Sequence, residues 1–188
     1  MGILIAEQSE IFHVPFGSPN SEGTPEGSFV DVKTHPEWIP VLPSCIGWPE
    51  TQALLNIINL PPSPFMSLAT DQGFTSGECI ERNIVLTSFV AISFSDISLN
   101  TKEGIKDVAE KLQHRLDVHL QQSCNDLGYS LHVTIRLELQ PTRFHDHEYE
   151  GWSLIILMAA SSHEQRLARQ HWGLSMTALQ TIIQEYTH

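Results

Sequence analysis

The chain has 188 residues, of which 41% are hydrophobic and 17% are charged, and its 22 acidic and 10 basic side chains give a net charge of −12. Nucleic acids and anionic membranes are bound by clustered Lys and Arg, so this charge balance argues against both as partners. No run of residues approaches the roughly 20 apolar residues of a membrane-spanning helix. No signal peptide is recognisable and the three cysteines form no CxxC motif, so we expect a cytoplasmic protein without a zinc ribbon.

Charge and proline are unevenly distributed along the chain. Residues 1–81 hold one basic residue, Lys33, together with ten acidic residues and ten of the eleven prolines. Residues 82–188 hold nine basic residues, twelve acidic residues and one proline, Pro141. Because proline interrupts both helices and inner strands, we expect a single domain, residues 1–188. In it an acidic, proline-rich front segment, 1–81, wraps around a core formed by 82–188.

The front segment alternates short extended pieces with breakers. Three pieces have the composition of strands: residues 3–6, 11–16 and 29–33. The Gly, Pro and Ser-rich stretch 17–27 predicts an exposed loop. Pro49 suits the first turn of a helix, where its missing N–H has no partner in any case, and Pro61-Pro62 ends that helix.

The next predicted element is a hairpin. Residues 65–70 and 78–94 form its arms around a turn at 71–73. Apolar side chains occupy both faces of the second arm, which is typical of a central strand covered on both sides.

A long helix is predicted over residues 101–127. Asn100 offers an N-cap, and Glu103 three residues later gives the spacing of a capping box. Apolar residues then recur at helical spacing on one stripe: Ile105, Val108, Ala109, Leu112, Leu116, Leu120 and Leu127. Gly128 stands where a left-handed C-cap belongs.

Two more strands and a second long helix complete the chain. Residues 131–140 alternate between apolar and polar, which indicates a strand with one solvated face, and 152–160 are apolar throughout. Ser161 and Glu164 repeat the capping-box spacing before a helix over 162–187. We therefore predict an α+β fold with a mainly antiparallel sheet and two long helices. This element order is similar to that of the Mog1/PsbP-like sandwich family, and we infer no activity from it.

One stretch contains candidate metal ligands. In an extended segment His145 and His147 would point the same way. With Glu148 or Glu150 they would provide the two imidazoles and one carboxylate of a non-haem metal site. The His-x-His spacing is similar to that of cupins, but the glutamates follow too soon and two long helices contradict an all-strand barrel. We interpret the stretch as a solvated polar loop, expect no cofactor, and keep a divalent metal as the alternative.

Two further histidine patterns are present. The stretch 131–135, with His132 and Thr134 between apolar residues, resembles one half of the two-histidine phosphoesterase signature, but no second copy exists. We interpret His132 as a solvent-facing side chain. His119 and His171 lie within the apolar stripes of the two long helices, and they could meet as a buried pair if both helices cover the same sheet face. The alternative is that each borders its stripe and hydrogen-bonds a backbone carbonyl, as is more common for such residues.

No catalytic nucleophile motif or Gly-rich phosphate loop occurs, so we favour a protein that is not an enzyme. It would bind a basic or amphipathic protein partner, as an adaptor, a secretion chaperone or an immunity protein. The candidate contact residues are Glu22, Glu26, Trp38 and Trp48. Two alternatives stay open: a metal-dependent enzyme or metal-binding protein centred on His145 and His147, and a small-molecule binder with a pocket between sheet and helix.

Overall fold

A computed structural model describes residues 2–14, 31–76, 84–144 and 149–186. Its elements, in chain order, are β1 (Gly2–Glu7), β2 (Phe12–Val14), η1 (Pro36–Val41), η2 (Pro43–Cys45), α1 (Pro49–Asn59), β3 (Phe65–Ser76), β4 (Ile84–Phe94), η3 (Ile97–Leu99), α2 (Lys102–Leu127), β5 (Val133–Phe144), β6 (Tyr149–Ser162) and α3 (Gln165–Glu185).

The strands form one mixed sheet in the order β1-β5-β6-β4-β3, with β2 also paired to β5. The β3–β4, β4–β6 and β5–β6 pairs are antiparallel, whereas β1 and β2 run parallel to β5. The predicted α+β class with a mainly antiparallel sheet is therefore confirmed. Its two parallel pairs are made by the front strands, which reach β5 from far away in the sequence.

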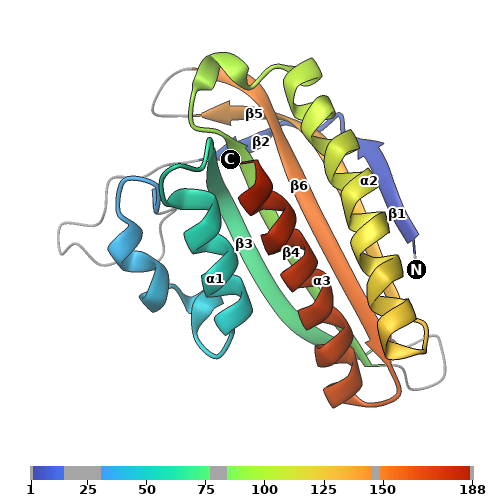
Figure 1. Ribbon diagram of the computed structural model, residues 1–188. Helices are drawn as coiled ribbons and strands as arrows, with labels where there is room; N and C mark the ends of the chain where they lie inside the picture. The colour runs from blue at the N-terminus through green and yellow to red at the C-terminus, as the bar shows by residue number, and fades with distance from the viewer. Residues whose placement is uncertain (1, 15–30, 77–83, 145–148, 187–188) are drawn as a thin grey trace.

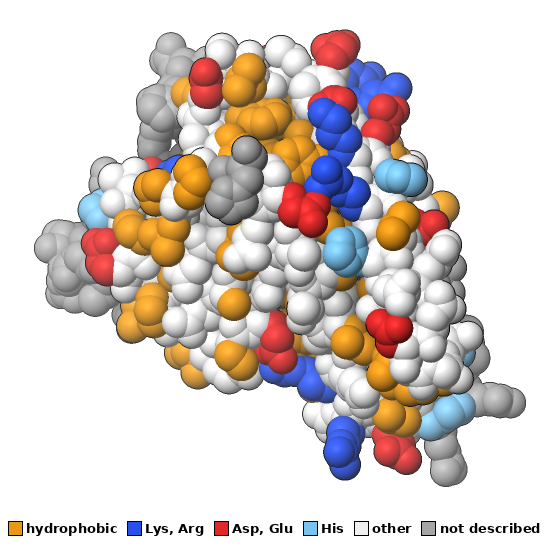
Figure 2. All heavy atoms as spheres, in the orientation of Figure 1, with side chains coloured by type: hydrophobic (Ala, Val, Ile, Leu, Met, Phe, Trp, Pro, Cys, Tyr) orange, Lys and Arg blue, Asp and Glu red, His pale blue; other side chains and the backbone are white. Residues whose placement is uncertain are grey.

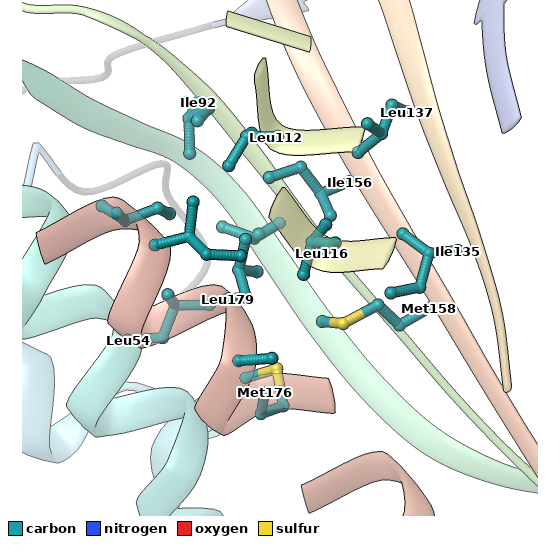
Figure 3. Packing of buried hydrophobic residues seen from close by; sticks show 14 of the residues in the cluster. Leu54, Ile92, Leu112, Leu116, Ile135, Leu137, Ile156, Met158, Met176 and Leu179 are labelled. Carbon is teal, nitrogen blue, oxygen red and sulfur yellow. The ribbon is translucent and has the colours of Figure 1, made fainter. Parts of the chain in front are cut away.

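All three α-helices pack on the same face of the sheet (Figure 1). Alternate residues of the central strands point to this face and are buried beneath the helices, as the period of two requires. Figure 3 shows Leu112 and Leu116 of α2 packed near Ile156 of β6, with Leu179 of α3 beside them. A smaller buried cluster, Val14, Leu68, Ala91 and Phe144, lies apart from this core.

The first long helix has the predicted extent but a different N-cap. Thr101 is the N-cap, and its hydroxyl accepts a hydrogen bond from the Gly104 N–H at 3.0 Å. Asn100 is instead buried, and its side-chain amide bonds both the N–H and the carbonyl of Phe94 at the end of β4. Gly128 adopts the predicted left-handed conformation, with φ of 71°. Asn100 therefore joins the helix start to the sheet instead of capping the helix.

Three local predictions are wrong. Strand β3 continues through residues 71–73, so the connection to β4 falls at 77–83, outside the described residues. Helix α3 begins only at Gln165, with no side-chain cap, because pairing with β4 extends β6 to Ser162. Residues 31–33 form a turn, not a strand, because the Asp31 carboxylate accepts hydrogen bonds from the backbone N–H groups of the two residues after Val32.

The described part of the front segment is attached to the core by polar as well as apolar contacts. Arg169 of α3 places its guanidinium 4.1 Å from the centre of the Trp48 ring and pairs with Glu50 at 2.6 Å. Within the front segment itself, Lys33 donates from its ammonium to the carbonyls of Ser63 and Phe65, both at 2.9 Å. Burial lowers the pKa of Lys33, although Asp31 nearby acts in the opposite direction.

The helix side of the molecule carries charges of both signs. Lys106 pairs with Glu110, and Lys111 pairs with Asp107, each one turn away along α2. Figure 2 shows blue and red side chains next to one another along this side, not a patch of one sign. Along the described ranges, no helix is both long enough and apolar enough to cross a membrane.

Candidate functional site: a histidine pocket

The predicted metal ligands do not come together in the part of the chain that the structure describes. His145, His147 and Glu148 lie outside the described residues. Glu150 is exposed and accepts hydrogen bonds from the guanidinium of Arg143 on the neighbouring strand. Within the described ranges, no three His, Cys, Asp or Glu side chains are grouped closely enough to hold a metal ion.

Two of the four predicted partner-contact residues, Glu22 and Glu26, also lie outside the described residues. Trp38 is half-buried and stacks on His35, with ring centroids 4.2 Å apart. Trp48 is half-buried against the edge of Trp172, with centroids 5.4 Å apart. Both tryptophans therefore already make contacts within the chain.

A pocket with a histidine-rich lining lies at one end of the sheet. There the C-terminal end of α2, the start of β5, the end of β6 and the start of α3 meet, at the lower right of Figure 1. Its volume is about 490 Å³, within the range of small-molecule sites. The lining residues are Tyr129, Ser130, His132, Ser161, Ser162, His163, Leu167 and His171. At the same corner Figure 2 shows histidine and hydrophobic side chains at the surface.

Local structure explains why these residues gather. The left-handed cap at Gly128 turns the chain out of α2, so that Tyr129 and Ser130 reach the pocket. The Ser161 N–H donates to the His132 carbonyl at 3.0 Å, which fixes the start of β5 against the end of β6. Four residues after Ser161, α3 begins at Gln165 and brings His171 back over the same end of the sheet.

His171 is the buried member of the pocket, with 4% of its surface exposed. Its Nδ1 atom is buried without a hydrogen-bond partner among the described residues. Burial, together with the nearby His132, lowers the pKa of His171, while a hydrogen bond to the Ser161 backbone raises it.

The neighbours of His171 differ from those predicted. Its ring centroid lies 6.1 Å from that of His132 and 5.9 Å from that of Tyr129. Although α2 and α3 do cover the same face, His119 is not among its ring neighbours in the described chain. His132 is exposed, as expected for a solvent-facing side chain, and its ring lies beside that of His171 of α3.

Two other hollows are present among the described residues. One, of about 590 Å³, lies between α1 and α3 beside Pro61 and Pro62, and one of about 310 Å³ lies over β3 and β4 near Phe89. Neither is lined by a buried polar side-chain atom that lacks a partner. The histidine pocket is distinguished by that atom, not by its size.

Comparison with known proteins identifies no family for this chain. No protein-family model, curated protein or solved structure matches this chain. The resemblance to the Mog1/PsbP-like sandwich therefore stays a likeness of element order, and the function must be argued from the pocket.

Proposed function

We propose that this protein binds a small ligand in the histidine pocket, the third of the functions considered from the sequence. The observation that carries the proposal is that His171 lines the pocket and that its buried Nδ1 atom has no hydrogen-bond partner among the described residues. A buried polar atom without a partner costs roughly 1–3 kcal/mol. A ligand with a polar group that bonds this nitrogen removes that cost.

The rest of the lining fits a small polar ligand. Hydroxyl groups are provided by Ser130, Ser161 and Ser162, and each of these can both donate and accept a hydrogen bond. The Tyr129 hydroxyl already accepts a hydrogen bond from Gln170 at 3.2 Å, which helps to hold its ring at the mouth of the pocket. Leu167 adds an apolar wall. A few polar groups within an otherwise apolar hollow are typical of ligand sites.

The proposal is tested by screening a fluorinated fragment library by NMR at pH 7.5 in the presence of EDTA, which excludes metal ions. We expect fragments that move the ring resonances of His171. Leu167→Trp fills the pocket mouth and should abolish their binding, as should His171→Phe, which removes both ring nitrogens. Val118→Trp, at an exposed site on α2 outside the pocket, is the matched control and should bind as the wild type does.

Two results would overturn the proposal. One is a screen in which no fragment moves the His171 resonances. The other is a set of fragments that bind the Leu167→Trp and Val118→Trp proteins equally well. Because Leu167 is already 37% exposed, its replacement leaves the buried core in place, so a loss of binding would not reflect unfolding.

A further inference from the structure

We infer that the sheet face opposite the helices is an interface between two copies of this chain, which pack sheet against sheet around a two-fold axis. The inference goes beyond the proposed function, because the residues of this face are not those that line the histidine pocket.

All three α-helices cover one face of the sheet, so the side chains that point away from them form a second face (Figure 1). In β4, Leu86 and Val90 are buried in the core beneath the helices. Because successive side chains of a strand alternate between the two faces, Thr87 and Phe89 belong to the second face. The register between the strands places the residues paired with these two on the same face.

Eight residues form two adjacent rows across β5, β6, β4 and β3, and we call them the open face. The central row holds, in that strand order, Arg136, Leu157, Phe89 and Asp71. The second row holds, in the same order, Thr134, Ala159, Thr87 and Gly73. On the other side of the central row, Ala91 belongs to the smaller buried cluster, which bounds the open face there.

The centre of the open face is apolar and accessible. Leu157 and Phe89 are half-buried, and the hollow of about 310 Å³ lies over them. Gly73 widens this hollow, since a Cβ atom on that residue would meet no other atom within 4 Å. A glycine inside a strand is typical of a place where a ligand or another chain approaches closely.

The two ends of the central row carry opposite charges. Arg136 is half exposed and its Nε atom pairs with Glu138 at 2.7 Å, whereas Asp71, three strands away, is exposed and one of its oxygens accepts from the Gln72 N–H at 2.8 Å. An arginine has five N–H donors and a carboxylate has two oxygens, so each of these groups can take a second partner.

A two-fold axis makes this arrangement complementary to itself. In such a dimer the same patch meets itself, so each contact between two residues occurs twice. With the axis parallel to the strands and midway between β6 and β4, β5 lies over the partner's β3 and β6 lies over the partner's β4. Arg136 then faces the partner's Asp71, and Leu157 faces the partner's Phe89. Sheets packed in this way lie about 10 Å apart, a gap that an arginine and an aspartate side chain span together.

The size of the open face indicates a weak dimer. Stable interfaces involve roughly 20–30 residues on each side, more than the open face provides. The net charge of −12 on each copy also opposes association. We therefore expect a Kd of roughly 10–100 µM.

The test is sedimentation equilibrium of the full chain over about 5–500 µM, a range that brackets the expected Kd. A reducing agent prevents a disulfide between two copies of Cys124, which is a free, half-buried thiol. Arg136→Glu and Asp71→Arg should each weaken the dimer at least about fivefold, because each replaces two attractions by two repulsions. The Arg136→Glu/Asp71→Arg double variant restores opposite charges and should dimerise at least about threefold more tightly than either single variant.

The matched control is Arg143→Glu, which reverses an exposed arginine of the same strand outside the open face and should dimerise as the wild type does. A wild type that stays monomeric at every concentration would overturn the inference and leave the open face to a different protein. Equal dimerisation of Arg136→Glu and Arg143→Glu would also overturn it, as would a double variant no tighter than the single ones. Fragment binding in the histidine pocket depends on other residues, so the proposed function stands or fails separately.

Discussion

Asn100 provides the sharpest test of how α2 is joined to the sheet. Its side chain is 1% exposed; its Oδ1 accepts from the Phe94 N–H at 2.7 Å and its Nδ2 donates to the Phe94 carbonyl at 3.1 Å. Its own carbonyl accepts from the Trp152 N–H at 2.9 Å. Asn100 therefore holds the end of β4 and contacts β6 as well.

Replacing Asn100 with Ala removes two hydrogen bonds and leaves both Phe94 backbone groups without these partners. With about 0.5–1.5 kcal/mol for each bond, and a desolvation cost for each orphaned group, the free energy of unfolding should fall by roughly 2–4 kcal/mol. For a chain of this length the melting temperature should drop by roughly 4–16 °C. Loss of the true N-cap in Thr101→Ala should cost about 1 kcal/mol.

Asn100→Asp separates the two roles of this residue. Asp and Asn are equally good N-caps, so an N-cap role predicts a nearly unchanged stability. The structure predicts a loss of roughly 2 kcal/mol or more, because a carboxylate has no donor for the Phe94 carbonyl and would be buried beside it. Urea denaturation followed by circular dichroism measures both variants. If Asn100→Asp is as stable as the wild type while Asn100→Ala loses only about 1 kcal/mol, the bonds to Phe94 do not hold the strand end.

Two further stability predictions follow from burial. Leu116→Ala should lower the free energy of unfolding by roughly 2–5 kcal/mol because Leu116 is fully buried. Lys111→Ala should change it by no more than about 0.5 kcal/mol because its ion pair with Asp107 is exposed. Equal effects of the two variants in urea denaturation would show that the assignment of the buried face of α2 is wrong. Burial lowers the pKa of His171 below its ordinary 6.5, so the unfolded chain takes up this proton first as the pH falls. The stability advantage of the wild type over His171→Gln should therefore be complete at pH 7.5 and shrink towards pH 5.5 in paired denaturation curves, and an advantage that grows on acidification would contradict the buried neutral ring.

Much of the local structure could be predicted from the sequence because it depends on neighbours along the chain. The apolar stripe of α2 and its glycine C-cap follow from helical periodicity and from the left-handed conformation at Gly128. Helix α1 begins at Pro49 and ends before Pro61 for equally local reasons. The α+β class follows from the order of these elements.

The sites where prediction failed are those where a distant partner decides. Asn100 has the composition and spacing of an N-cap, but bonds to the end of β4 are available only in the folded chain. Residues 71–73 have the composition of a turn, yet pairing with β4 keeps them in the strand. In both places, hydrogen bonds to residues of the sheet outweigh the local preference.

The candidate site likewise could be predicted only in part from the sequence. The sequence singled out His132 and His171 separately, one as a strand residue and one as a residue of a helical stripe. Their meeting depends on the register of β5 against β6, which sets the Ser161 N–H on the His132 carbonyl, and on α3 returning over that end of the sheet. Periodicity determines which side of an element a residue occupies. Only the packing of elements distant in sequence determines that the Nδ1 atom of His171 is buried and that its ring lies beside a second imidazole.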